Sequence, residues 1–352
     1  MELVINDRIR NRKVDFFNEF SLSLQYDSVG STFGISFYFD PENNEHKELM
    51  CIGHYHICKI THNNETLLTG NILSQKFTSN SGRTMVVLSG YSLGGVLEDC
   101  EIPPSLYPLQ SDGLTLKQIA TKLLNPFKLS LVVDSEVESI VNSTYATSTA
   151  KETQSVKAYL SELTAQKDLI LSHNESGNIV ITKAKTNATP LYKFERGLPA
   201  NEMELTFNGQ GMHSHITVMK QADSDGGNAG EETIRNPYVI NSVYRPKVKT
   251  QSSGDDNDSN KATRMALRDE LKNMTLKIQL DRWELNGKIV KTNNIVEVIN
   301  PDIYLYKKSK WFIQSIDFKG NEKERTATLN CVLPEVFNNN TPEYLFKGIN
   351  LQ

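Results

Sequence analysis

The spacing of apolar residues changes along this chain, and the change limits the folds it can adopt. Apolar and polar residues alternate in 312–318 and again in 327–333, on either side of a turn at Gly320-Asn321. Such alternation is typical of two strands that each bury one face and are joined as a hairpin. Between about 98 and 187 the apolar residues instead follow a helical period. The chain is therefore expected to combine β-rich ends with a mixed middle.

The first 97 residues read as strands without a helix. Short runs rich in β-branched and aromatic residues occupy 21–26, 33–39, 56–61, 66–77 and 84–88. The turn between the third and fourth runs is Asn63-Asn64, a dipeptide that favours a hairpin. Five or more strands in succession predict a small barrel or sandwich.

The middle of the chain has two helical stripes and a hairpin. The first stripe consists of apolar residues at helical spacing, namely Leu116, Ile119, Ala120, Leu123 and Leu124. Thr115 with Gln118 supplies a capping box in front of it, and Pro126 ends it. A second stripe, Val156–Leu163, follows Ser155, and a hairpin at 169–182 turns at Asn174-Glu175-Ser176-Gly177. Residues 98–187 thus form a small mixed α/β domain.

β character returns from about residue 188. A strand is expected at 216–219, and the pattern of 261–274 predicts a helix with Leu267, Leu271 and Met274 on one side. The order is therefore a barrel, an insert, and a second barrel with an insert of its own. We divide the chain into a first β-barrel domain at 1–97, an α/β insert domain at 98–187, a second β-barrel domain at 188–236 and 288–334, and a small α/β domain at 237–287 and 335–352.

Charge and composition exclude several partners. The formal net charge is -4, so there is no overall basic field to hold nucleic acid or an anionic membrane. The first residues contain no apolar core of a secretory signal, and no apolar run approaches the roughly 20 residues of a membrane helix. The four cysteines, Cys51, Cys58, Cys100 and Cys331, include no CxxC pair, which indicates free thiols made in a reducing cytoplasm.

One local motif could support hydrolysis. Gly90-Tyr91-Ser92-Leu93-Gly94 is formally GxSxG, and Ser92 would be the nucleophile of an α/β-hydrolase if a strand preceded it and a helix followed. The following residues run into Ile102-Pro103-Pro104, which cannot sustain that helix. The blander interpretation, a glycine-containing domain boundary, is the better one.

Two His-x-His pairs, His54/His56 and His213/His215, could each offer two imidazoles to one metal if they lie on strands. Neither pair has a third ligand at suitable spacing, so plain surface or interface residues are expected. The acidic stretches 223–228 and 255–258 resemble calcium loops but lack the EF-hand spacing. Trp283 and Trp311 are expected to be core or interface anchors. The sequence predicts a protein that is not an enzyme, with no catalytic, cofactor-binding or metal-binding residues.

Several segments in order resemble the phage Mu-type baseplate hub protein, the family also called the 43 kDa tail protein and related to the hub part of type VI secretion spike proteins. The resemblance lies in segments 90–102, 115–120, Pro126-Phe127, 213–221, Tyr244-Arg245-Pro246, the helix 261–274, Trp283, Asn286-Gly287, 293–299, 311–318 and 326–334. Two positions depart from the family pattern. Arg282 replaces a glycine, and Ile289-Val290 stand where the family has a tryptophan.

The resemblance implies a mainly β chain with α/β inserts, an α+β fold with two similar β-barrel domains, and a homotrimer whose six barrels form a pseudo-sixfold ring. Such a ring is a structural hub of a contractile phage tail or a related injection machine, located in the virion baseplate after synthesis in the bacterial host cytoplasm. It would join a sixfold tail tube above to a threefold spike below. A separate spike protein is expected because the sequence stops shortly after the last strand. DNA would pass through the lumen without specific binding, and no membrane insertion is expected.

Two alternatives remain open. A β-rich, tail-associated carbohydrate- or receptor-binding module would need an exposed aromatic platform, and no aromatic cluster is visible in the sequence. A serine hydrolase using Ser92 would need the activated geometry discussed above.

Overall fold

The computed structural model describes residues 2–346, except 7–10, 15–16, 81, 83, 108, 147, 198, 221–230, 252–258, 322 and 339. The chain divides into two compact units, which we describe separately. Unit 1 consists of residues 1–183 and 317–327, and unit 2 of residues 184–316 and 328–352. Strands outnumber helices in the described residues, so the chain is mainly β, as predicted.

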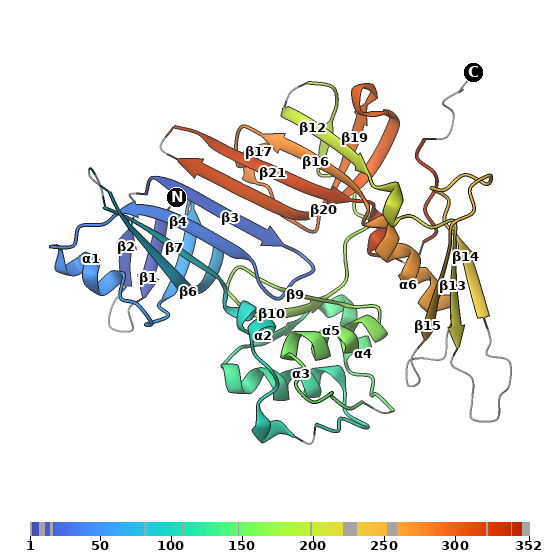
Figure 1. The fold of residues 1–352 in the computed structure, drawn as a ribbon, viewed down its shortest axis with the longest axis horizontal. Helices are drawn as coiled ribbons and strands as arrows, with labels where there is room; N and C mark the ends of the chain where they lie inside the picture. The colour runs from blue at the N-terminus through green and yellow to red at the C-terminus, as the bar shows by residue number, and fades with distance from the viewer. Residues whose placement is uncertain are drawn as a thin grey trace. The chain divides into compact units, whose positions relative to one another are not determined.

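The first part of unit 1 is an antiparallel sheet. Its strands are β1 (Glu2–Asn6), β2 (Asn11–Val14), β3 (Glu19–Gln25), β4 (Thr32–Tyr38), β5 (Ile57–His62), β6 (Glu65–Ser79) and β7 (Thr84–Ser92). They are hydrogen-bonded in the order β3–β4–β7–β6–β5–β1–β2 (Figure 1). Side chains such as Phe33, Ile35 and Phe37 alternate inward and are buried, which is the period-2 signal seen in the sequence.

The turn predicted between β5 and β6 is present, and a helix was missed. Asn63 and Asn64 have φ of 49° and 63°, the left-handed values that a tight hairpin needs and that asparagine tolerates. Between β4 and β5 the chain forms α1 (Asn44–Leu49), whose N-cap Asn43 accepts hydrogen bonds from two backbone amides. The prediction that residues 1–97 lack a helix was therefore wrong, because a six-residue helix is too short to show a periodic apolar stripe.

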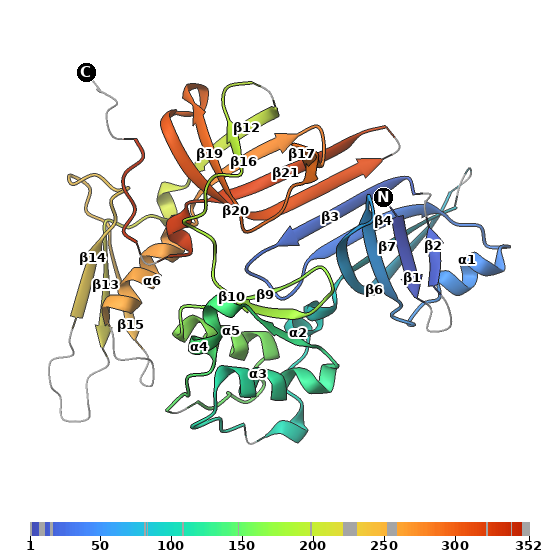
Figure 2. The same cartoon turned by 180° about the vertical axis from the view of Figure 1, so that it is seen from behind.

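The second part of unit 1, residues 93–183, is the α/β domain. Its elements are η1 (Leu93–Gly95), α2 (Val96–Asp99), η2 (Pro104–Leu106), α3 (Leu116–Leu124), η3 (Asn125–Phe127), β8 (Leu131–Val133), η4 (Ser135–Val137), α4 (Glu138–Val141), α5 (Val156–Gln166), β9 (Ile170–His173) and β10 (Ile179–Thr182). β10 pairs parallel with β8 and antiparallel with β9. The helices α3 and α5 lie beside this three-stranded sheet (Figure 2).

The predicted features of the α/β domain are confirmed. Thr115 and Gln118 form both hydrogen bonds of the capping box, and the five residues of the first stripe are buried in one apolar core. Ser155 caps α5 by accepting a hydrogen bond from Ala158 N. In the predicted hairpin turn, Gly177 N donates to Asn174 O at 2.9 Å and Gly177 has φ of 84°, a value that favours glycine.

Unit 2 is built on a second sheet. Its main strands are β11 (Tyr192–Phe194), β12 (Ala200–Phe207), β16 (Met274–Leu280), β19 (Ile295–Asn300), β20 (Leu305–Asn321) and β21 (Arg325–Val332). Their order is β12–β16–β21–β20–β19–β11, and β11 pairs parallel with β19. The predicted closing hairpin corresponds to β20 and β21, which also carry residues of unit 1. Trp311 is fully buried and Trp283 nearly so, so both are core residues.

Short elements complete this part of unit 2. They are the two-residue strands β17 (Glu284–Leu285) and β18 (Lys288–Ile289), and the 3₁₀ turns η5 (Gly209–Gly211), η6 (Pro301–Ile303) and η7 (Pro334–Val336).

Unit 2 also contains a small layered region that we call the α6 domain. Three strands, β13 (His215–Lys220), β14 (Glu231–Arg235) and β15 (Pro246–Gln251), pair in the order β14–β13–β15, and α6 (Ser259–Leu271) covers one face (Figure 1). The helix ends at Leu271, and Met274 begins β16. Met274 is therefore not the last residue of the helix, as the sequence pattern suggested. Its apolar side chain fits either period at a helix-to-strand junction.

Neither β region closes into a barrel within the described residues. In unit 1 the strand order ends at β2, and in unit 2 it ends at β11 and β12. The prediction of closed barrels was therefore wrong for the described part of the chain. Alternation shows that one face of a strand is buried, but an open sheet and a barrel produce the same alternation.

Candidate functional site

Ser92 lies at the end of β7 and has a structural environment. Its side chain is 1% exposed, and its Oγ accepts a hydrogen bond from Ser31 N at 3.0 Å. Ser92 N in turn donates to Ser31 O at 2.8 Å, so the two residues form a reciprocal pair. Its φ of -59° and ψ of 156° are ordinary extended values, whereas a nucleophile elbow holds its serine in a strained turn. This geometry ties Ser92 to the backbone and hides its hydroxyl from a substrate.

The glycines of the same motif have packing roles. A Cβ atom on Gly90 would lie 1.9 Å from Asn71 O, so only glycine lets β6 and β7 approach this closely. A Cβ atom on Gly94 would lie 2.3 Å from Val29 O. Close backbone approach and one buried hydrogen bond therefore account for the GxSxG pattern.

His54 and His56 do not lie on a strand. They precede β5, and Tyr55 between them has a φ of 48°, which breaks the alternation on which a shared face depends. The two rings are 5.3 Å apart between centroids and nearly perpendicular, and His54 Nε2 lies 3.3 Å from Cys51 Sγ. His56 is 3% exposed, with its Nε2 3.4 Å from Glu48 O.

His213 and His215 have separate partners. His213 Nδ1 lies 2.8 Å from Glu270 Oε1, whereas His215 contacts Ser214 Oγ through Nδ1 and Arg235 through Nε2. Glu270, on α6, is 2% exposed and also accepts hydrogen bonds from His213 N at 2.8 Å and Lys247 Nζ at 3.2 Å. The arrangement is a buried carboxylate satisfied by several donors, which fixes the helix against its sheet.

The remaining candidates give no centre for chemistry in the described residues. The acidic stretches 223–228 and 255–258 lie outside those residues. Within them, no group of three or more His, Cys, Asp or Glu residues is arranged to hold a metal ion. All four cysteines are free thiols, and burial raises the pKa of the Cys58 thiol to about 12, so this thiol is not a nucleophile near neutral pH. No helix among the described residues is long and apolar enough to cross a membrane.

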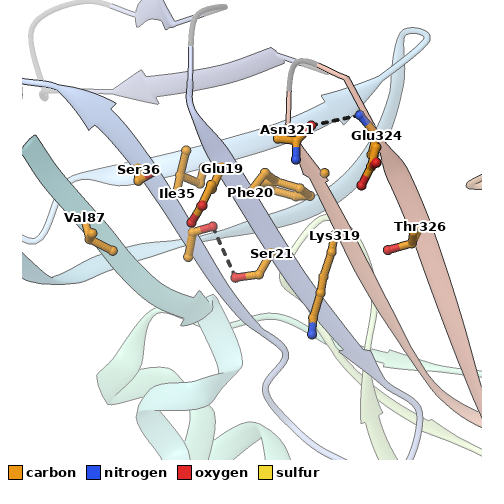
Figure 3. Close-up of a pocket in the computed structure, with 12 residues that line it drawn as sticks. Glu19, Phe20, Ser21, Ile35, Ser36, Val87, Lys319, Asn321, Glu324 and Thr326 are labelled. Carbon is orange, nitrogen blue, oxygen red and sulfur yellow. Dashed lines mark hydrogen bonds between the residues drawn. The ribbon is translucent and has the colours of Figure 1, made fainter.

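A pocket of about 420 Å³ lies within unit 1, beside β3, β4 and the 319–326 turn region (Figure 3). Its polar lining includes Glu19, Ser21 and Lys319. Ser21 Oγ donates to Gly34 O at 3.3 Å, and Glu324 N donates to Asn321 Oδ1 at 2.8 Å. The polar groups shown are engaged in holding strands and a turn, so the pocket resembles a surface trough rather than a catalytic cleft.

Unit 2 gathers aromatic side chains that are far apart in the sequence. Five rings contact one another with centroids 5.4–6.3 Å apart, and they belong to Tyr238, Tyr304, Tyr306, Tyr344 and Phe346. Tyr304 and Tyr306 are 45% and 52% exposed. Sequence reasoning missed this cluster, because three separate segments supply it and no local pattern connects them.

Comparison with known proteins places this fold among phage tail proteins. The 43 kDa tail protein of prophage MuSo2 from Shewanella oneidensis matches with a TM-score of 0.79 and 18% identity, over 96% of this chain and 100% of that one. The tail protein from Neisseria meningitidis MC58 matches with a TM-score of 0.77 and 17% identity, over 96% and 98% of the two chains. The E. coli c3393 protein, a component of the type VI secretion system, matches with a TM-score of 0.53 and 11% identity, over 98% and 80%.

These likenesses establish the fold as that of Mu-like tail proteins, and the resemblance inferred from the sequence is confirmed. More particularly, residues 94–183 match the family model of the baseplate hub protein gp44-like, second domain. This segment begins at η1 and ends after β10, so it coincides with the α/β domain seen in the structure. A comparison with curated protein sequences found no match.

Proposed function

We propose that this chain is a structural hub of a phage-type baseplate, in which three copies form a pseudo-sixfold ring. The match of residues 94–183 to a baseplate hub domain is the observation that carries the proposal. The similarity of nearly the whole chain to solved tail proteins supports it. In this role the protein is not an enzyme, and the buried, backbone-bound Ser92 favours that interpretation.

The architecture suits a ring in which each copy contributes two β modules. One module is the sheet of unit 1, and the other is the sheet of unit 2. Three copies then supply six modules, which can join a sixfold tail tube to a threefold spike. The contacts between copies are heterologous and close by rotation. The division into four domains that we made from the sequence remains part of this proposal.

Terminal strands offer a means of association. Strand β12 ends the order of the unit 2 sheet, and its exposed residues Glu202, Glu204 and Thr206 alternate along it. A strand with a free edge can accept hydrogen bonds from another chain. We propose the edges of the two sheets as contacts between neighbouring copies, with the tail-tube protein and a separate spike protein as the other partners.

Size-exclusion chromatography with light scattering tests the trimer. The chain mass is 39.7 kDa, so we expect a species of about 119 kDa. Electron micrographs of that species should show a ring with a central hole. A strict monomer at tens of micromolar, or a compact particle without a hole, contradicts the proposal.

The aromatic cluster favours a second candidate, a tail-associated carbohydrate- or receptor-binding module. Exposed Tyr304 and Tyr306 supply the aromatic surface that such a module needs. Binding to host surface polysaccharide that disappears in Tyr304→Ala would support this candidate, and a trimeric ring that ignores the polysaccharide would oppose it.

A further inference from the structure

The outer face of the unit 2 sheet carries a concentration of lysines. Three strands align Lys193 on β11, Glu297 on β19 and Lys310 on β20 in one row, because Lys193 is opposite Glu297 and Glu297 is opposite Lys310. Their neighbours along each strand are buried, so these three side chains point away from the core. Lys308, two residues from Lys310, forms an ion pair with Glu297 at 3.5 Å. Three lysines thus surround one carboxylate.

An irregularity in β20 adds to this concentration. The register between β19 and β20 shifts between Val298 and Asn300, and the part of β20 opposite the shift exposes three residues in succession, Tyr306, Lys307 and Lys308. A regular strand would turn the middle one inward, whereas a bulge re-aims side chains. We call the set Lys193, Tyr306, Lys307, Lys308 and Lys310 the lysine face.

The ring of Tyr306 is presented next to these cations. Tyr304 precedes it in a left-handed conformation with φ of 68°, which is costly for a residue that has a Cβ. The rings of Tyr304 and Tyr306 meet at 5.5 Å in an edge-to-face contact, and Tyr306 remains 52% exposed. Backbone strain held beside an exposed aromatic ring is characteristic of a binding surface.

The charge balance of the face is locally positive, although the chain as a whole carries -4. Four lysines are opposed by the half-buried Glu297, and Asp302 near the start of β20 is paired with Arg196 at 2.7 Å. In the part of the chain that the structure describes, Lys193, Lys307 and Lys310 have no ion-pair partner. The face therefore complements an anionic ligand.

We infer that the lysine face binds the phosphodiester backbone of nucleic acid without reading its sequence. Lysine is depleted at protein–protein interfaces, so four exposed lysines are a poor match for a protein partner. Lysines beside an exposed aromatic ring are instead the combination that nucleic-acid strands require, since phosphates take the charges and bases stack on the ring. The site is inferred from the face alone, and its location on the channel of a ring rests on the proposed function.

Net negative charge elsewhere makes this binding weak and sensitive to salt. Four phosphate contacts predict a loss of affinity of about a hundredfold between about 50 mM and 200 mM salt. Such a contact suits a surface along which DNA slides rather than one that holds it. We expect fluorescence anisotropy of short labelled duplexes with the full-length protein to show this salt dependence, equally for two unrelated sequences.

Variants on and off the face locate the site. Lys308→Gln with Lys310→Gln should reduce the salt dependence from about a hundredfold to about tenfold over the same range. The matched control is Lys117→Gln with Lys122→Gln on exposed positions of α3, which changes the net charge equally and should leave binding unaltered. Equal weakening by both pairs, or binding that ignores salt, overturns the inference.

Two further measurements define the ligand. Tyr306→Ala should weaken binding of a single-stranded oligonucleotide about tenfold without altering its salt dependence, because stacking and not charge is removed. Polyglutamate of matched charge should displace DNA poorly. Displacement by polyglutamate as effective as that by unlabelled DNA would show an acidic protein to be the occupant and would overturn the inference.

The same samples separate this inference from the proposed function. Light scattering of the Lys308→Gln, Lys310→Gln protein should give the mass of the wild type, because both side chains are exposed. A trimer that fails to bind DNA overturns the lysine face alone. A monomer that binds DNA with the expected salt dependence overturns the hub and leaves the lysine face intact.

Discussion

The α/β domain and the α6 domain both pack helices on a three-stranded sheet, but they fill the space between the layers differently. In the α/β domain this space is apolar, and Leu116, Ile119 and Leu160 are fully buried there. In the α6 domain it contains the carboxylate of Glu270, which is 2% exposed and bonded to His213 and Lys247. The first arrangement gains stability from burial of apolar surface, whereas the second gains a fixed geometry from satisfied polar groups.

The outer faces of the two domains differ as well. The sheet of the α6 domain leaves Val248 60% exposed and Met219 40% exposed on the face that α6 does not cover. Buried polar contacts therefore hold this small domain together while apolar groups remain on its surface. The comparison teaches that a helix on a sheet can be specified by apolar volume in one region and by hydrogen-bond partners in another.

The largest effect is expected from a cavity in the α/β domain. Leu160→Ala removes a fully buried side chain of α5 and should lower the free energy of unfolding by about 4 kcal/mol, from lost burial and the cavity left behind. Urea denaturation followed by circular dichroism measures the loss, and hydrogen exchange should quicken in residues 93–183. Val132→Ala, at a 37% exposed position of the same domain, is the control. Equal losses from the two variants would mean that the apolar interior is not the source of stability.

Glu270→Gln tests the polar interior of the α6 domain. The change keeps the shape but removes the charge that strengthens the bonds from His213 and Lys247, so we expect a loss of about 2 kcal/mol. The control is Asp269→Asn, its neighbour on the helix, which is 63% exposed and should cost less than about 0.5 kcal/mol. Thermal denaturation and hydrogen exchange of α6 measure both, and similar effects for the pair would contradict a special role for Glu270.

Much of the α/β domain could be predicted from the sequence, because its signals are local. The capping residue Thr115, the stripe from Leu116 to Leu124 and the turn at Gly177 are each encoded within a few residues. The Asn63-Asn64 turn was predictable for the same reason. Local patterns specify elements, and the elements appeared where they were expected.

The α6 domain and the surfaces depend on contacts between distant residues, and the sequence does not reveal these. The bond from His213 to Glu270 spans 57 positions, so the histidines resembled a metal-binding pair on a strand. The parallel pairing of β13 with β15, the open ends of both sheets and the gathering of Lys193 with Lys310 all arise from topology. Alternation alone could not distinguish an open sheet from a barrel.

The cap of α3 should contribute less than either interior. Thr115→Ala removes the side chain that accepts a hydrogen bond from Gln118 N at 3.2 Å, and should cost about 1 kcal/mol. Thr121→Ala, at an exposed position on the same helix, is the matched control and should be neutral or slightly stabilising. Urea denaturation of the two variants measures the difference, and a cost for Thr121→Ala equal to that of Thr115→Ala would place the effect in helix propensity instead of the cap.

The smallest effect is expected from protonation of His173, at the end of β9. Burial lowers the pKa of His173 below its usual range, because the charged ring is poorly solvated there, although the bond to Ser28 and the nearby Glu175 and Glu98 oppose the shift. The unfolded chain therefore binds a proton more readily than the folded one. The contribution of this group to stability is complete above pH of about 6.5 and is lost as the pH falls through the lower folded value.

His173→Asn separates this effect from the general loss of stability in acid. An asparagine amide can replace Nδ1–H, which donates to Ser28 O at 2.7 Å, but it takes up no proton. Denaturation midpoints between pH 7 and pH 5 should thus fall less steeply for this variant than for wild type, while His54→Asn, at an exposed histidine, should follow the wild type. Parallel slopes for wild type and His173→Asn would mean that protonation elsewhere destabilises the protein. A flatter slope for His173→Asn alone would show that the apolar domain, like the polar one, contains a titratable side chain whose partner determines its charge.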